Sequence, residues 1–275
     1  MSIQAADVAK LRKMTGAGMM DCKKALTEAD GDFDRAVQII REKGQAIANK
    51  RADREATEGA VIAKVSADGK KGALIALNCE TDFVAKNDDF VALAHKICDL
   101  ALANLPENLE ALLALNFDGT TLAEAVVAQS GITGEKMEVA FYAKAEAEYV
   151  ASYIHMGNKL ATLIGFNQAG FDAQIGRDVA MQAAAMAPVS ISENDVPAAV
   201  IEEELKIAKE KARLEGKAEE MLDKIAQGRL QKFFKESTLL NQASVKDNKN
   251  TIAQILSGAS KGLTVVAMER YALKS

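Results

Sequence analysis

Few side chains in this sequence are of the types that carry out covalent or metal chemistry. The histidines are His95 and His155, and the cysteines are Cys22, Cys79 and Cys98. The chain has no GxxxxGK(S/T) loop, no GxSxG elbow and no HExxH pair, the common phosphate-binding, serine-hydrolase and zinc-protease motifs. Cys79 and His155 could act as nucleophile and base, but Cys79 ends an apolar stretch, where a small buried cysteine is expected. The residue types therefore favour a function without catalytic side chains.

One polar loop stands out because it carries an aromatic residue beside an acidic one. It covers residues 78–87, follows an apolar stretch and has Asp82 next to Phe83. An aromatic side chain at such a position either packs into the core of its own domain or inserts into a partner. Composition alone favours the first alternative, in which Phe83 is buried.

Helical periodicity predicts three short helices before this loop. The first covers residues 5–15, the second begins at Met19 after a Gly-rich break, and Asp32 caps the third, which Gly44 ends. So small a bundle has a thin core, and we expect it to dock on the rest of the chain or on a partner. Met19 and Met20 are then either core residues or a soft contact surface.

Charge distinguishes this module from the rest of the chain. The 275 residues include 34 Lys and Arg against 39 Asp and Glu, a net charge of −5. Residues 1–54 carry +3 and the remainder −8, and residues 45–57 are polar enough to predict a charged tether. A basic module favours nucleic acid or an acidic protein as its partner. The chain has no tryptophan, however, and no aromatic-rich strand of the kind that binds RNA.

The body of the chain contains a weak internal repeat of a hairpin, a loop and a helix. Apolar runs on either side of Gly-containing turns predict two hairpins, and each is marginal unless a helix packs across it. The predicted strands are residues 60–65, 72–78, 149–155, 160–167 and, near the C-terminus, 263–270. Further helices are predicted at residues 109–115, 122–130 and 135–147.

A highly charged stretch at residues 201–236 predicts two more helices. It holds nine acidic and nine basic residues, and Gly216 interrupts its apolar stripe. Two helices that fold back at Gly216 form an antiparallel coiled-coil arm. The alternative is a pair of surface helices that lie flat on the body.

These elements predict an α+β fold with small antiparallel sheets. Apolar residues make up 49% of the chain and charged residues 27%, which is ordinary for a globular protein. We expect an N-terminal domain with its tether at 1–54, a core N-subdomain at 55–147, and a core C-subdomain at 148–275. The last includes the arm, at about 196–236.

Three stretches of the chain match a known family in residue type and in order. They are LRKMTGAGMMDCKKAL at 11–26, TDFVAKN at 81–87 and GRLQKF at 228–233. On these stretches the chain resembles the bacterial translation elongation factor Ts family, and the resemblance extends over essentially its whole length. It implies that the three-helix module is the family's UBA-like N-terminal domain and that the charged helices are its coiled coil.

The resemblance further implies a guanine-nucleotide exchange factor for elongation factor Tu, with no catalytic chemistry, cofactor or metal of its own. The partner is bound in its GDP-bound and nucleotide-free forms, and homodimerisation within a larger complex is left open. By resemblance, the segment that displaces Mg²⁺ from the partner is Thr81, Asp82, Phe83 and Val84, and other contacts are Met19, Met20, His155 and Gly157.

Two alternatives lack exchange activity. An RNA-binding translation accessory uses the basic module, and its RNA affinity falls steeply with salt. A ubiquitin-like-recognition adaptor explains the module alone. The resemblance favours neither, and it implies no direct nucleic-acid contact. Free cysteines and the lack of a targeting pattern predict a cytoplasmic location, and no apolar run approaches the roughly 18–20 residues that span a bilayer.

Overall fold

Two three-stranded antiparallel sheets form the centre of the chain, of which the computed structural model describes residues 3–274. Their strand orders are β1-β2-β5 and β6-β7-β8. The first sheet consists of β1 (Glu58–Val65), β2 (Lys71–Cys79) and β5 (Glu138–Glu146), and the second of β6 (Tyr149–Ile154), β7 (Leu160–Phe166) and β8 (Val265–Ala272). The predicted α+β class is confirmed, and both predicted hairpins are present.

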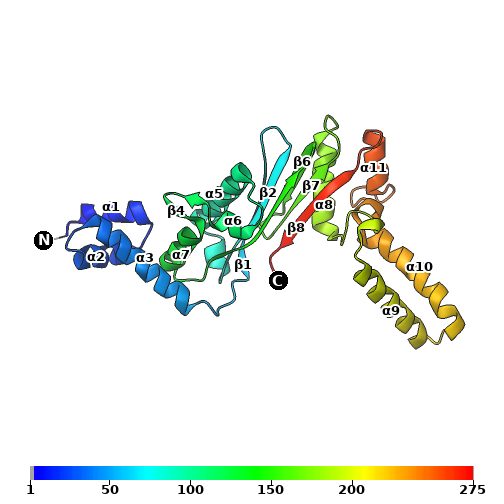
Figure 1. The fold of residues 1–275 in the computed structure, drawn as a ribbon, viewed down its shortest axis with the longest axis horizontal. Helices are drawn as coiled ribbons and strands as arrows, with labels where there is room; N and C mark the ends of the chain where they lie inside the picture. The colour runs from blue at the N-terminus through cyan, green and yellow to red at the C-terminus, as the bar shows by residue number, and fades with distance from the viewer. Residues whose placement is uncertain (1–2, 275) are drawn as a thin grey trace.

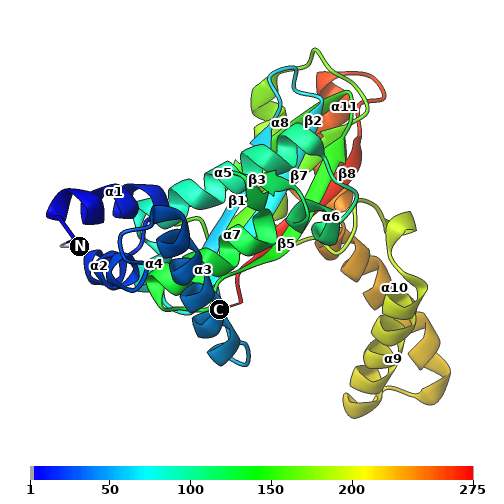
Figure 2. The ribbon, with the colours of Figure 1, turned by 60° about the vertical axis from the view of Figure 1, so that its left-hand side comes forward.

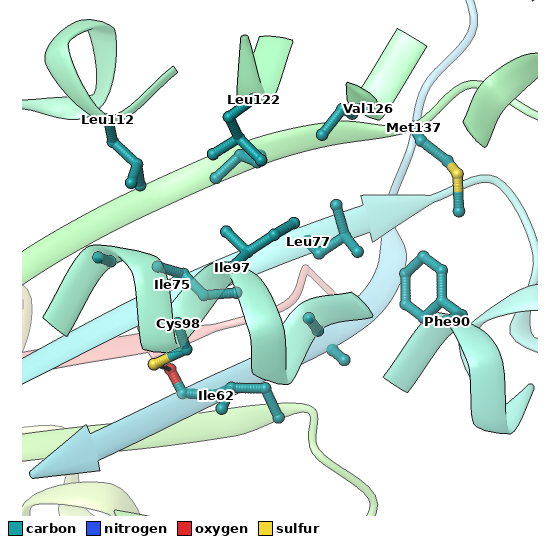
Figure 3. Close-up of a cluster of buried hydrophobic side chains, with 14 of the residues drawn as sticks. Ile62, Ile75, Leu77, Phe90, Ile97, Cys98, Leu112, Leu122, Val126 and Met137 are labelled. Atoms are coloured by element: carbon teal, nitrogen blue, oxygen red, sulfur yellow. Dashed lines mark hydrogen bonds between the residues drawn. The ribbon is translucent and has the colours of Figure 1, made fainter. Parts of the chain in front are cut away.

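Strands β1, β2 and β7 are apolar along most of their length, as expected for strands that are buried on both faces. Ile62 and Ile75 point toward α5 (Asp88–Asn104) and form one core with Phe90 and Ile97 (Figure 3). The opposite face of the same strands packs against the second sheet, where Leu163 is fully buried. The outer face of the second sheet is covered by α8 (Ala173–Met186). The body is therefore a four-layer stack of helix, sheet, sheet and helix.

The helix predicted at residues 135–147 is wrong, because residues 138–146 form β5. Alanine, glutamate and lysine favour a helix locally, but β5 pairs along almost the whole length of β2. Tyr142 also donates a hydrogen bond from Oη to the carbonyl of Pro106, at 3.0 Å. Long-range pairing therefore overrides local propensity here.

The N-terminal module consists of α1 (Ala5–Thr15), α2 (Met19–Glu28) and α3 (Phe33–Lys50) (Figure 1). The expected end of the third helix at Gly44 is wrong, since α3 continues for six residues beyond it. Gly44 instead lies where α3 crosses α7 (Leu122–Thr133), and a Cβ on Gly131 of α7 would come within 2.3 Å of the Gly44 Cα. The expected tether at 45–57 is correspondingly shorter, because its first residues are helical.

The predicted arm is confirmed as an antiparallel pair, α9 (Ala198–Leu214) and α10 (Glu219–Ser237). Figures 1 and 2 show it projecting from the body, which excludes the alternative of helices lying flat. Gly216 makes the reversal with φ +76°, a conformation that favours glycine. Ala212 and Ala226 are fully buried, and an ion pair at 2.7 Å joins Arg229 of α10 to Glu215, the C-cap residue of α9.

The remaining elements are short and connect these parts. They are α4 (Asp82–Ala85), α6 (Leu109–Leu113), β3 (Asn116–Phe117), β4 (Thr120–Thr121), α11 (Ile252–Ala259) and two 3₁₀ turns, Glu193–Asp195 and Leu239–Asn241. Within residues 3–274, no helix has the length and apolar character needed to cross a membrane.

Candidate partner-binding site

The polar loop after β2 forms a single helical turn, α4, that presents Phe83 to solvent. Thr81 is the N-cap of this turn, and its Oγ accepts a hydrogen bond from the backbone N–H of Val84 at 3.5 Å. Val84 and Ala85 pack against the core of the first sheet. Successive residues of a helix point about 100° apart, so Phe83 points outward and is 85% exposed. The expectation from composition that Phe83 is buried is wrong, because Val84 takes the inward position.

Asp82 places an ionised carboxylate beside this ring. Lys86, one turn later, donates a hydrogen bond from Nζ to Asp82 Oδ2 at 2.6 Å. That bond and the positive charge of Lys86 lower the pKa of Asp82, and Lys159 adds a smaller effect. The turn therefore presents an apolar ring and a negative charge side by side.

Two glutamates anchor the turn from the side that faces the protein. Glu135 accepts hydrogen bonds from the Thr81 N–H at 3.0 Å and from the Thr81 hydroxyl at 2.5 Å. Glu80 accepts a bond from the Lys136 N–H at 2.6 Å and pairs with Arg51 at 2.8 Å. No sequence pattern predicted either anchor. The available signal for Glu135 was Gly134, the left-handed C-cap of α7, which directly precedes it.

A second candidate surface is the turn between β6 and β7, at residues 155–159. His155 is exposed, with its Nδ1 3.1 Å from the hydroxyl of Tyr153, and Gly157 adopts φ +87°. Lys159 pairs with Glu58 at the start of β1, at 2.8 Å. Glu58 is the register partner of Cys79, the last residue of β2, and α4 begins shortly after it. The structure therefore brings both predicted contact segments to the same end of β1.

Met156, whose side chain is 91% exposed within this turn, was not predicted as a contact residue from the sequence. A large apolar residue between a histidine and a turn glycine was the available signal. Its exposure resembles that of Phe83, since neither side chain takes part in the buried clusters of the described residues.

Met19 and Met20, at the start of α2, are 45% and 65% exposed. The alternative that both are core residues is therefore wrong, and a contact surface is what their exposure allows. A groove of about 640 Å³ lies between this module and the body, and its lining includes Lys13, Gly16 and Phe83. The module thus comes close to the Phe83 turn.

The arrangement offers no activated nucleophile in this region. Burial raises the pKa of Cys79 to about 12, with contributions from the nearby charges of Glu135 and Glu58, and its Sγ donates to the Thr81 carbonyl at 3.2 Å. This is opposite to the lowered pKa of a reactive thiol. Among residues 3–274, no group of three or more His, Cys, Asp or Glu side chains is placed to hold a metal ion. What the site can do is present a ring and a charge to another molecule.

Comparison with known proteins assigns the chain to a family. A family model described as Elongation factor TS matches residues 80–275. The chain belongs to the elongation factor Ts family. Among curated members, it is 51% identical to Elongation factor Ts of Christiangramia forsetii over 98% of each chain. It is 52% identical to that of Porphyromonas gingivalis over the full length of both chains, and 53% identical to that of Amoebophilus asiaticus over 98% of each.

Family membership makes the chain a translation elongation factor, which acts in protein biosynthesis. The family model begins at Glu80, directly after β2. The N-terminal module lies outside that match, but the relatives align over the module as well because they cover nearly the whole chain.

Proposed function

We propose that this chain binds elongation factor Tu, in its GDP-bound and nucleotide-free forms, and promotes the release of GDP. On this proposal it is a guanine-nucleotide exchange factor whose residues take no part in covalent chemistry. The observation that carries the proposal is the 85% exposure of Phe83 on a turn whose neighbouring residues are anchored. An apolar ring held out on a fixed turn is suited to insertion between elements of a partner.

The energetic gain from insertion is large enough to matter. Burying a phenylalanine side chain is worth about 1.5–3 kcal/mol, which corresponds to about a 10- to 100-fold change in an equilibrium constant. The four-residue turn already holds the ring outward, so little conformational entropy is lost on binding. Asp82, one residue earlier, brings its negative charge to the same place and perturbs the polar contacts of the partner's Mg²⁺.

Nucleotide release then follows from linkage. If the chain binds the nucleotide-free partner more tightly than the GDP-bound partner, GDP must bind the complex more weakly by the same factor. GTP displaces the chain by the same reciprocity. The exposed residues Met19, Met20, His155 and Gly157 provide the other contacts on this proposal, and they contribute affinity for both states of the partner.

The experiment that tests this function measures both sides of the linkage. The rate of release of a fluorescent GDP analogue from elongation factor Tu is followed with and without the chain. The affinity of the chain for the GDP-bound and the nucleotide-free partner is measured in parallel. We expect faster release, tighter binding to the nucleotide-free form, and a ratio of the two affinities equal to the loss of GDP affinity in the complex. Binding without accelerated release would instead support an adaptor.

Asp82→Ala separates the charge from the ring. We expect this variant to bind the nucleotide-free partner but to accelerate GDP release less than the unmodified chain, because the charge that acts at the Mg²⁺ site is missing. Glu148→Ala is the matched control, since Glu148 is also an exposed acid in a surface ion pair, with Lys70 at 3.1 Å. Equal release rates for the two variants would remove Asp82 from the proposed mechanism.

A further inference from the structure

Residues 131–136 lie between the N-terminal module and the Phe83 turn and contact both. At one end, Gly131 of α7 meets Gly44 of α3 at the helix crossing. Ile132 packs into the core of the module. At the other end, Glu135 and Lys136 hold the residues that precede Phe83. One short segment therefore contacts the module on one side and the turn on the other.

Glu135 and Thr81 are joined by two hydrogen bonds in a partly buried position. Both carboxylate oxygens are used, one by the Thr81 N–H and one by the Thr81 hydroxyl. The same hydroxyl oxygen accepts the N–H of Val84 and so caps α4. Hydrogen bonds to a charged acceptor are shorter and stronger than neutral ones. Glu135 thereby fixes the first residue of the turn at both its backbone and its side chain.

The adjacent residues reinforce this contact. Lys136 donates from its backbone N–H to Glu80 and from Nζ to the carbonyls of Ala52 and Arg54, both at 3.1 Å. Burial acts to raise the pKa of Glu80, but the bonds from Lys136 and Arg51 outweigh it and lower that pKa. Glu80 is thus ionised and held immediately before Thr81. The base of the turn is fixed from the module side and from the segment that follows α7.

We propose that Glu135 is a positioning residue for nucleotide release, which fixes Thr81 so that Phe83 is held in the orientation that inserts into the partner. The inference rests on the proposed function, because it assigns a role within the same site. A turn of four residues has few hydrogen bonds of its own and does not stay folded unaided. A ring on a loosened turn must be ordered when it binds, and that ordering weakens the insertion step. Because Glu135 orders the turn in the free protein, no further ordering is needed on binding.

The test compares Glu135→Ala with Glu135→Gln and with the control Glu148→Ala in the full chain. Glu148 lies in an exposed ion pair with Lys70, so its removal changes the net charge equally without touching the turn. Hydrogen–deuterium exchange of the amides at residues 80–86 reports the order of the turn directly. The maximal rate of GDP release and the half-saturating concentration of the chain report function. Thermal unfolding confirms that each variant is folded.

For Glu135→Ala we expect the amides at 80–86 to exchange at least about tenfold faster, since bonds to a charged group exceed the roughly 1.4 kcal/mol that corresponds to a factor of ten. The maximal release rate falls by a similar factor, while the half-saturating concentration changes less because the other contacts remain. Glu135→Gln retains an acceptor for the Thr81 N–H and shows a smaller loss in both measurements. Glu148→Ala leaves both unchanged.

Two results would overturn the proposal. Unchanged amide exchange in Glu135→Ala would show that the contact does not order the turn. Faster exchange with an unchanged maximal release rate would show that order at the turn is not needed for release. Failure of the proposed function is distinguishable from both, because the unmodified chain would then fail to accelerate GDP release while the amide exchange still reports the contact.

Discussion

The crossing of α3 and α7 depends on two glycines, and Gly131→Ala tests it. A Cβ on Gly131 would lie 2.3 Å from the Cα of Gly44, 3.1 Å from its backbone N and 3.5 Å from its carbonyl carbon. Carbon atoms in favourable contact are about 3.5–4.0 Å apart, so the two helices must separate locally by more than about 1 Å. The atoms in the way belong to the backbone and have no rotamer to change. We therefore expect α3, and the module with it, to shift on the body.

The change in local stability caused by Gly131→Ala has two contributions of opposite sign. Overpacking a close contact costs about 1–3 kcal/mol, while replacing glycine by alanine within a helix gains up to about 1 kcal/mol. Gly228→Ala in α10 isolates the second term, because a Cβ there meets no atom within 4 Å. Relative to that control, Gly131→Ala is expected to be destabilising locally by about 1–3 kcal/mol.

Hydrogen–deuterium exchange measures these local stabilities separately. In Gly131→Ala the amides of α3 and α7 exchange faster, and in Gly228→Ala the amides of α10 exchange more slowly. The reasoning is refuted if the α3 and α7 amides of Gly131→Ala are protected as well as in the unmodified chain, since the helices would then accommodate the methyl group without moving apart.

Three further predictions concern the body and the arm. Ile75→Ala removes a fully buried side chain from the core in Figure 3 and should lower the unfolding free energy by about 2–5 kcal/mol, and a loss below about 1 kcal/mol in denaturant titration would contradict the assigned packing. Burial raises the pKa of the Cys79 and Cys98 thiols to about 12 from the ordinary 9.0. The folded state therefore favours the neutral thiols, and this contribution to stability is complete below pH 9 and is lost as the pH rises toward 12. Thermal unfolding should show progressive destabilisation across that interval, and alkylation at pH 8 should modify these thiols only after unfolding. Gly216→Ala forces alanine into φ +76° and should destabilise the arm by about 1–2 kcal/mol, with faster amide exchange in α9 and α10, in contrast to the slower exchange expected for Gly228→Ala.

The two hairpins and the arm could be predicted because local patterns and tertiary packing agree there. Residues 72–78 are almost continuously apolar, and β2 is buried on both faces. At residues 138–146 the local pattern and the tertiary packing disagree. The composition favours a helix, and only pairing with β2 makes the segment a strand. The prediction that Gly44 ends a helix is wrong for a related reason. A glycine that ends a helix and one that allows another helix to approach look the same without the partner helix.

The candidate site was predictable only in part. The resemblance predicts that Thr81 to Val84 contact the partner, but it gives no account of what holds them in place. Glu135 follows Thr81 by 54 positions in the sequence, and no periodicity or spacing connects residues so far apart. The direction of Phe83 was likewise decided by its neighbour, because Val84 occupies the core. Both features depend on tertiary contacts, which a single sequence does not display.

The central claim is that insertion of the Phe83 ring promotes GDP release. It is tested most directly by measuring how far the Phe83→Ala variant still accelerates that release. Phe83 is 85% exposed, and Leu214 at the tip of the arm is 81% exposed, so Leu214→Ala is a control of matched exposure. Neither truncation should change the unfolding free energy by more than about 0.5 kcal/mol. The account predicts that Phe83→Ala accelerates GDP release from elongation factor Tu about 10- to 100-fold less than the unmodified chain, whereas Leu214→Ala is fully active. Equal acceleration by Phe83→Ala and Leu214→Ala would contradict it.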